Sequence, residues 1–367
     1  MRVATTTVSS LILLMTLALV IVAMPAHSVL INDLYVAEVV TVSQSDAQRR
    51  RDAATGLRDV LVRVSGRVDV VEHPLVAAAL RSPEDYYTEF SYQTVENDGS
   101  DDELPASTPQ EAPTSQKMQI RFEPSLISDL LRRADLPVWG SNRPSVLFWV
   151  ARGSGAERAV LGEGSAGLFA QSVRERAESR GVPVYFPVWD LEDSSRVTVS
   201  EIWGRFLDQI EAASERYSPD KLLVVRVEKR YAGQWHVDWS YGDQGEWRVG
   251  TLLKASEAEA AVALVDEITA LLSAQYAGTS ARTALRLNVE GISGVAALAE
   301  VERYLQRLSS VLDVRLRRVK GDLLTFDVRS EGDLQQLIDL IALDRDLTLL
   351  NSDVGASTVW YRWSGEN

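Results

Sequence analysis

The sequence predicts a multidomain α+β and α/β protein of three small mixed α/β units, of which the last is ferredoxin-like. A length of 367 residues is enough for two or three domains. Segments with the period of two of a strand alternate with segments that have the 3.6-residue period of a helix. The C-terminal segments follow the β-α-β-β-α-β order of a ferredoxin-like fold. The expected units are 29–136, 137–277 and 278–367.

The first 28 residues have the pattern of a Sec-type secretory signal peptide. Arg2 is the only charged residue before Asp33, residues 8–22 are almost wholly apolar, and Ala26-x-Ser28 offers small residues at the exit. The apolar stretch is shorter than the roughly 20 residues of a spanning helix. We therefore expect cleavage near Ser28 and a periplasmic protein, with an uncleaved membrane anchor as the alternative.

Composition excludes several chemistries. The chain has no cysteine, which excludes disulfides, thiol nucleophiles and thiolate metal sites. Its formal net charge is −14, and a negative surface repels nucleic-acid phosphates and anionic lipids. We expect no nucleic-acid partner, and membrane contact only through the signal segment if it stays uncleaved.

The first unit combines strands, helices and an acidic insertion. Ser45-x-x-Gln48 has the capping-box spacing of a helix start, and Gly66 ends the apolar helical periodicity. Residues 96–116 are rich in Asp, Glu, Ser, Thr and Pro, so we predict a disordered hairpin insertion there. The other elements expected are strands over 35–42, 90–94 and 118–122, a short helix after Pro74 and a helix over 124–134.

The second unit alternates buried strands with helices, which predicts an α/β layered domain. Residues 146–150 form a continuous apolar run, typical of a strand buried on both faces. Thr198-x-x-Glu201 is a capping box that opens a helix expected to reach Tyr217. The other elements expected are a helix ending at Gly181, strands over 182–188 and 222–227, a hairpin over 234–241 and 246–253, and a helix over 256–276.

The third unit is ferredoxin-like because of its element order and short turns. The turn Lys320-Gly321-Asp322 separates two expected strands. The elements expected are a strand over 285–289, a helix over 294–308, strands over 311–319 and 323–328, a helix over 333–343, and strands over 347–350 and 358–363.

Two groups of side chains form a candidate ligand or partner surface. Asp190, Glu192 and Asp193 follow a predicted strand, where ligands of open α/β sheets bind and where carboxylates can hold Ca²⁺ or Mg²⁺. A solvated acidic loop is the alternative. Trp235 and Trp239 share one face of a predicted strand, which suits a sugar or protein surface, with core packing as the alternative.

No catalytic residue, cofactor site or metal site is assigned. Gly162-x-Gly164-x-x-Gly167 matches a dinucleotide fingerprint in letters, but the preceding strand ends near Val150, too far upstream for that mechanism. Beyond the signal segment the chain has only His73 and His236, which lie in different units.

Several stretches together resemble an uncharacterised family of Gram-negative periplasmic proteins known as a domain of unknown function. They are Ala53–Gly66 (AATGLRDVLVRVSG), Leu136–Pro144 (LPVWGSNRP), Val182–Asp193 (VPVYFPVWDLED), Ala213-Ser214, Arg216-Tyr217 and Gln275-Tyr276-Ala277. The resemblance implies periplasmic residence and no assigned activity. The first unit is also loosely similar to domains of flagellar and curli assembly proteins and of lipoprotein activators, at the level of fold alone.

The function expected from these observations is a periplasmic binding or assembly accessory that contacts another envelope protein or peptidoglycan. One alternative is a carboxylate- or metal-dependent hydrolase that acts on a wall polymer through the Asp190 loop. A second alternative is a small-ligand binding protein whose site lies in the second unit.

Overall fold

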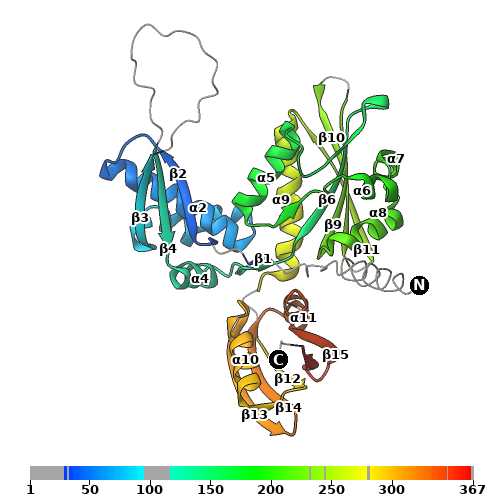
Figure 1. Cartoon of the computed structure of the whole chain (residues 1–367). Coiled ribbons are helices and arrows are strands. Elements are labelled where there is room, and N and C mark those ends of the chain that lie inside the picture. The colour runs from blue at the N-terminus through cyan, green and yellow to red at the C-terminus, as the bar shows by residue number, and fades with distance from the viewer. Residues whose placement is uncertain are drawn as a thin grey trace, which may run out of the picture.

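The computed structural model describes residues 29–30, 33–94, 116–230, 233–243, 245–278, 282–344 and 346–364. Figure 1 shows three mixed α/β units, which confirms the multidomain α+β and α/β class. The predicted signal peptide over 1–28 lies outside the described residues. So does the predicted insertion over 96–116, apart from Gln116, which begins a strand. None of the helices in the described ranges has the length and apolar character needed to cross a bilayer.

The first unit is a three-stranded antiparallel sheet covered on one face by helices. Helix α2 packs on the sheet through Leu57 and Leu61 against Met118, Ile120 and Phe122, all fully buried. The elements are β2 (Val36–Thr41), α2 (Asp46–Ser65), η2 (Val68–Glu72), α3 (Pro74–Ala79), η3 (Pro83–Asp85), β3 (Tyr87–Thr94), β4 (Gln116–Phe122) and α4 (Pro124–Arg133), with strand order β2-β4-β3.

The start of α2 confirms half of its predicted cap. The Ser45 hydroxyl accepts a hydrogen bond from the Gln48 backbone N–H at 3.3 Å, as an N-cap does. The Gln48 side chain, however, donates to Asp52 Oδ1 at 2.7 Å. Because Asp52 is a buried carboxylate four residues along the helix, it takes the amide group that a full capping box would use.

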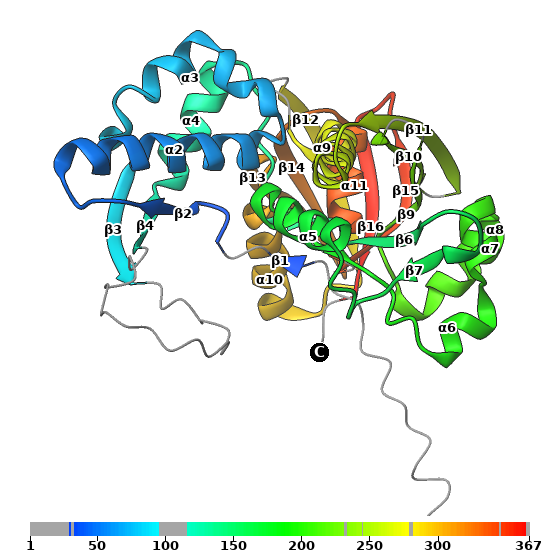
Figure 2. The ribbon, with the colours of Figure 1, turned by 90° about the horizontal axis from the view of Figure 1, so that it is seen from above.

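The second unit is a mixed six-stranded sheet with helices on both faces (Figures 1 and 2). Strand β6 is parallel to β8 and β9, and it is buried on both faces as its apolar run predicts. Helices α5 and α9 cover one face, and α6, α7 and α8 pack on the other. The sheet order is β11-β10-β9-β6-β7, with β8 also paired to β6.

The bounds of these elements in chain order are β6 (Val146–Arg152), β7 (Ala159–Leu161), α5 (Leu168–Arg180), β8 (Val184–Tyr185), α6 (Leu191–Arg196), α7 (Val199–Gly204), α8 (Leu207–Ser214), η5 (Glu215–Tyr217), β9 (Lys221–Lys229), β10 (Trp235–Asp243), β11 (Glu246–Lys254) and α9 (Glu257–Tyr276); a short η4 (Gly155–Glu157) precedes β7. The sequence missed β7 and overestimated the length of β8.

The predicted helix from Thr198 to Tyr217 is instead broken in two. Its capping box is present, with the Thr198 and Glu201 side chains bonded reciprocally. The helix then stops because Arg205 adopts a left-handed conformation, with φ of 56°. Gly204 favours this break, since glycine is a weak helix former and the Phe206 ring packs directly against it.

The third unit is a five-stranded sheet of order β13-β14-β12-β16-β15. The predicted order holds through α11, but the last two strands form a hairpin, and β16 lies parallel to β12. In a ferredoxin-like sheet the last strand lies directly beside the first. Here β16 lies between β12 and β15, and β15 forms the edge of the sheet. The elements are β12 (Arg282–Glu290), α10 (Gly294–Arg307), β13 (Val311–Lys320), β14 (Leu323–Glu331), α11 (Leu334–Ala342), β15 (Leu347–Asp353) and β16 (Thr358–Trp363).

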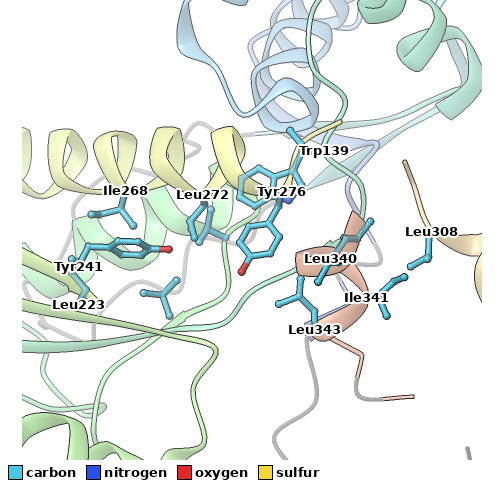
Figure 3. Close-up of a cluster of buried hydrophobic side chains, with 14 of the residues drawn as sticks. Trp139, Leu223, Tyr241, Ile268, Leu272, Tyr276, Leu308, Leu340, Ile341 and Leu343 are labelled. Atoms are coloured by element: carbon cyan, nitrogen blue, oxygen red, sulfur yellow. The ribbon is translucent and has the colours of Figure 1, made fainter. Parts of the chain in front are cut away.

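The second and third units share one hydrophobic core. Figure 3 shows Leu272 and Tyr276 of α9 beside Leu340 and Leu343 at the end of α11. Polar bonds reinforce the contact, because the Gln275 amide donates to Asp339 Oδ2 at 3.1 Å. We infer that much of the stability of either unit depends on the other, since apolar burial is the main favourable term in folding.

Residues 136–144 join all three units. Trp139 N–H donates to Val64 O at the end of α2, and Asn142 donates to Leu340 O in α11. The chain also passes so close to the third unit that a Cβ on Gly140 would lie 2.3 Å from the Ser309 Cβ. This stretch therefore cannot change shape without disturbing every unit.

Arg143 is the buried centre of this joint. Its guanidinium donates to the carbonyls of Gly140 and Trp139, and its cation lies 4.1 Å from the Trp139 ring centroid. It also donates to Arg180 O at 2.8 Å and Arg63 O at 2.8 Å, near the C-terminal ends of α5 and α2. Cations suit helix C-termini, where carbonyl oxygens lack partners. Burial lowers the pKa of Arg143 to about 9, which still leaves it charged at neutral pH.

Candidate binding groove

The structure brings the three predicted carboxylates together around an arginine. Asp190 is the N-cap of α6 and accepts from the Asp193 backbone N–H at 2.9 Å. Arg216, on η5, donates to Asp190 at 2.9 and 3.1 Å and to Asp193 at 3.0 Å. Glu192 lies 3.6 Å from the same guanidinium. The Arg216 guanidinium therefore occupies the position between the three carboxylates that a bound metal ion would take.

Asp193 is fully buried, and its second oxygen is also used. The Tyr217 hydroxyl donates to Asp193 Oδ2 at 2.6 Å, and the Trp189 N–H donates to it at 2.8 Å. The Arg216 guanidinium lowers the pKa of Asp190 to about 2, while Asp190 raises the pKa of Arg216. Over the described residues there is no group of three or more His, Cys, Asp or Glu arranged to hold a metal ion. The arrangement anchors α6 to η5.

The two predicted tryptophans lie on β10 and face α9. Trp239 is 4% exposed and covers Gly250 so closely that a Cβ there would lie 2.2 Å from the indole. Trp235 is half-buried, and the Arg152 guanidinium lies 5.3 Å from its ring centroid. Both contribute to the core of the second unit. Little of either indole is available to a ligand.

A groove of about 770 Å³ lies between the first unit and α5 of the second. Figure 2 shows the first unit on one side of α5 and the sheet of the second unit on the other. Its walls are β2 with its neighbour Gln119, the outer side of α2 near Arg63, and residues 175–180 of α5. The joint around Arg143 fixes both walls, because it bonds to Arg63 and to Arg180.

The groove reaches the first half of β2, which is an edge strand of its sheet. Val36, Ala37 and Glu38 are consecutive, so their side chains alternate between faces, yet all three line it. Phe122 N–H donates to Tyr35 O, which fixes the residues of β2 that pair with β4. The alternate residues, including Glu38 and Val40, therefore turn their N–H and C=O groups away from β4. No hydrogen bond to these groups is present within the described ranges.

Arg63 closes one end of this edge. Its Nη1 donates to the carbonyls of Asp33, Leu34 and Val36, at 3.1, 3.3 and 2.8 Å. The strand edge is therefore blocked at Val36 and open from Glu38 onward. Open edges pair readily with another strand, which makes this one a natural docking position.

The groove is acidic. It is lined by five carboxylates and three guanidiniums, and each guanidinium already donates to a carbonyl or a carboxylate. Of the carboxylates, Glu38 is paired with Lys117 at 3.3 Å. Arg176 forms a bidentate pair with Asp266 at 2.9 Å, and Arg180 donates to Gly66 O at 2.6 Å. Desolvation by the surrounding walls raises the pKa of Asp59, despite the nearby arginines. The carboxylates are Asp33, Glu38, Asp59, Glu175 and Glu178.

A second concavity of about 230 Å³ lies in the second unit at the amino end of β9. Its buried cation, Lys221, pairs with Asp243 and lies 5.4 Å from the Tyr276 ring centroid. Trp247 forms one wall beside Gly242. The charge of Lys221 is already neutralised, so this hollow offers a ligand less than the groove does.

Sequence reasoning did not find the groove because its walls are distant in the chain. Glu38, Arg63 and Glu178 belong to separate elements and two units. The sequence offered one signal that this region makes polar contacts. Arg63 lies near the end of a helix whose neighbouring residues Val60, Leu61 and Val64 are apolar and buried.

Comparisons with known proteins leave the activity open. Residues 28–140 match a family described as a domain of unknown function (DUF8605), which spans the first unit and the start of the joint. No curated protein matches the chain. A crystal structure of an uncharacterized protein is 12% identical, with a TM-score of 0.15, and covers 36% of this chain and 97% of that one. Allophanate hydrolase of Kluyveromyces lactis is 9% identical, with a TM-score of 0.15, and covers 68% of this chain and 62% of that one. TM-scores this low support no conclusion about the fold or the activity of this chain.

Proposed function

We propose that this protein is a non-enzymatic binding or assembly accessory of the bacterial envelope, and that it holds an extended basic segment of another protein along β2. The unpaired edge of β2, which begins at Glu38 on the wall of an acidic groove, is the observation that carries this proposal. The envelope location rests on the signal-like sequence of residues 1–28.

The chemistry of the groove favours an extended peptide over a polysaccharide or a small molecule. Exposed N–H and C=O groups at Glu38 and Val40 are spaced to pair with a peptide backbone, as in strand addition. The five carboxylates of the walls favour lysine and arginine side chains on the incoming strand. Main-chain pairing would supply affinity, and the carboxylates would supply selectivity.

Other parts of this chain fit the groove poorly. The segment 96–116 contains three glutamates and three aspartates and no basic residue, so its charge has the same sign as that of the walls. A second copy is disfavoured by the net charge of −14. A partner with basic segments has the complementary charge.

The hydrolase alternative has less support. It depends on Asp190, Glu192 and Asp193, and all three lie within 3.6 Å of the Arg216 guanidinium. A carboxylate held in this way is a poor base and a poor metal ligand, because Arg216 stabilises its ionised form and occupies its oxygens.

The test uses eight-residue peptides in which Lys or Arg alternates with Val or Thr, measured by fluorescence anisotropy on the full chain. Glu38→Pro removes one edge N–H, and Pro is tolerated at edge strands. We expect it to weaken binding at least about fivefold, from a lost backbone hydrogen bond and a lost charge. Glu38→Gln, which keeps the N–H, should have the smaller effect.

Circular dichroism of both variants checks that the sheet is intact. Peptides with Glu in place of Lys and Arg serve as the charge control and should not bind. The proposal is overturned if basic peptides fail to bind at millimolar concentration. It is also overturned if Glu38→Pro and Glu38→Gln weaken binding equally, because charge alone would then explain the attraction.

A further inference from the structure

Over the described residues, helices pack on only one face of the sheet of the third unit. The side chains of Leu287, Phe326 and Tyr361 point into the core formed with α10 and α11. Because strand side chains alternate, the intervening residues of β12, β13 and β14 lie on the opposite face. Figure 1 shows α10 and α11 both packed against this unit's sheet.

Four arginines and two aspartates alternate across this open face. Arg286 lies opposite Asp327 on the neighbouring strand, and Arg315 lies opposite the same aspartate from the other side. Asp313 lies opposite Arg329. With Arg317 these six side chains line a concavity of about 420 Å³, which the turn at Ala356 and Ser357 borders.

Each aspartate is shared by two guanidiniums. Arg315 Nε and Arg329 Nη2 approach the same oxygen, Asp313 Oδ2, at 2.9 and 3.0 Å. Arg317 Nη1 lies 3.2 Å from both oxygens of Asp327, and Arg286 Nε lies 4.0 Å from one of them. Four positive charges therefore face two negative ones, in a chain whose net charge is −14. The four guanidiniums remain between 48% and 74% exposed.

We propose that this concavity binds the phosphate group of a small phosphomonoester. Guanidinium forks bind phosphate oxygens in a bidentate manner, which suits four arginines gathered around one concavity in a chain of net charge −14. The excess of two positive charges matches a phosphomonoester, which carries close to two negative charges above pH 7. The site is independent of the β2 groove, which lies between the first and second units.

Isothermal titration calorimetry with glycerol 1-phosphate, at pH 7.5 and low salt, tests this site on the full chain. The double variant Arg286→Gln/Arg329→Gln should weaken binding at least about tenfold, since each lost guanidinium removes charge-assisted hydrogen bonds. The matched control is Arg303→Gln/Arg307→Gln, which removes the same charge from exposed positions on α10. It should change the affinity less than twofold.

Vesicles of phosphatidylglycerol and phosphatidylcholine in equal parts separate a soluble ligand from a lipid headgroup. Binding of glycerol 1-phosphate without co-sedimentation with the vesicles is the result expected. No heat at millimolar glycerol 1-phosphate overturns the proposal, whether or not vesicles bind. So does equal weakening by the two double variants, which would indicate unspecific attraction to net charge.

Discussion

Asp190, which the sequence suggested as a ligand-binding carboxylate, contributes to the stability of the fold. Its carboxylate accepts from Arg216 and from the start of α6, and these bonds lower its pKa to about 2 from the ordinary 3.8. A carboxylate with a lowered pKa in the folded state stabilises the fold above its unfolded pKa. That contribution is lost as the pH falls from about 4 toward 2.

The prediction at this residue is therefore a stability difference that depends on pH. Asp190→Asn should lower the urea midpoint at pH 7, because Asn can cap α6 but cannot pair with Arg216. The difference in urea midpoint between the variant and the wild type should decrease as the pH falls below about 4. Urea titrations from pH 7 to pH 3 measure it, with Asp322→Asn in an exposed turn as the control. A gap that stays constant over this range would contradict the ion-pair account.

The ends of α2 and α5 are the elements that hold the first unit to the second. Arg143 bonds to carbonyls at both ends, and it is fully buried. Arg143→Met keeps much of the volume but leaves five carbonyl acceptors without this donor. We expect a loss of about 3 kcal/mol or more in the free energy of unfolding, because unsatisfied buried polar groups are costly.

Chemical denaturation of Arg143→Met measures this loss. Arg58→Met, at an exposed position of α2, should change the free energy of unfolding by less than about 0.5 kcal/mol. Arg143→Lys should recover little, because three ammonium donors lack the planar fork of a guanidinium. Full recovery with lysine would show that charge, and not the fork, holds the joint.

Local elements were predictable where the sequence pattern alone determines them. The apolar run of β6 and the capping box of α7 involve neighbouring residues, so both could be predicted. The insertion of β16 beside β12 depends on pairing between distant segments. The break at Arg205 was missed, although Gly204 was a local signal for it. Proximity of Asp190 and Asp193 followed from sequence, but their neutralisation by Arg216 did not, since the arginine lies 23 residues beyond Asp193.

At the scale of the whole molecule, the shared core predicts that the second and third units unfold together. Leu340 of α11 is 1% exposed and belongs to the same cluster as Leu223 of β9. Leu340→Ala should cost about 2–5 kcal/mol. Hydrogen exchange in rising urea should then show β9 and β14 losing protection at the same lowered urea concentration, because the loss is transmitted through α9.

The first unit supplies the matched comparison for this experiment. Leu57 is fully buried in a separate cluster with Met118 and Ile120, so Leu57→Ala removes as many atoms from a different core. It should lower the protection of β4 by more than that of β14, since the two cores are separate apolar clusters joined by polar contacts such as those of Arg143 and the Arg132–Glu331 pair. If Leu340→Ala lowers protection in β14 and leaves β9 unchanged, the second and third units are independent domains. Figure 3 would then show an interface between two domains instead of one continuous core.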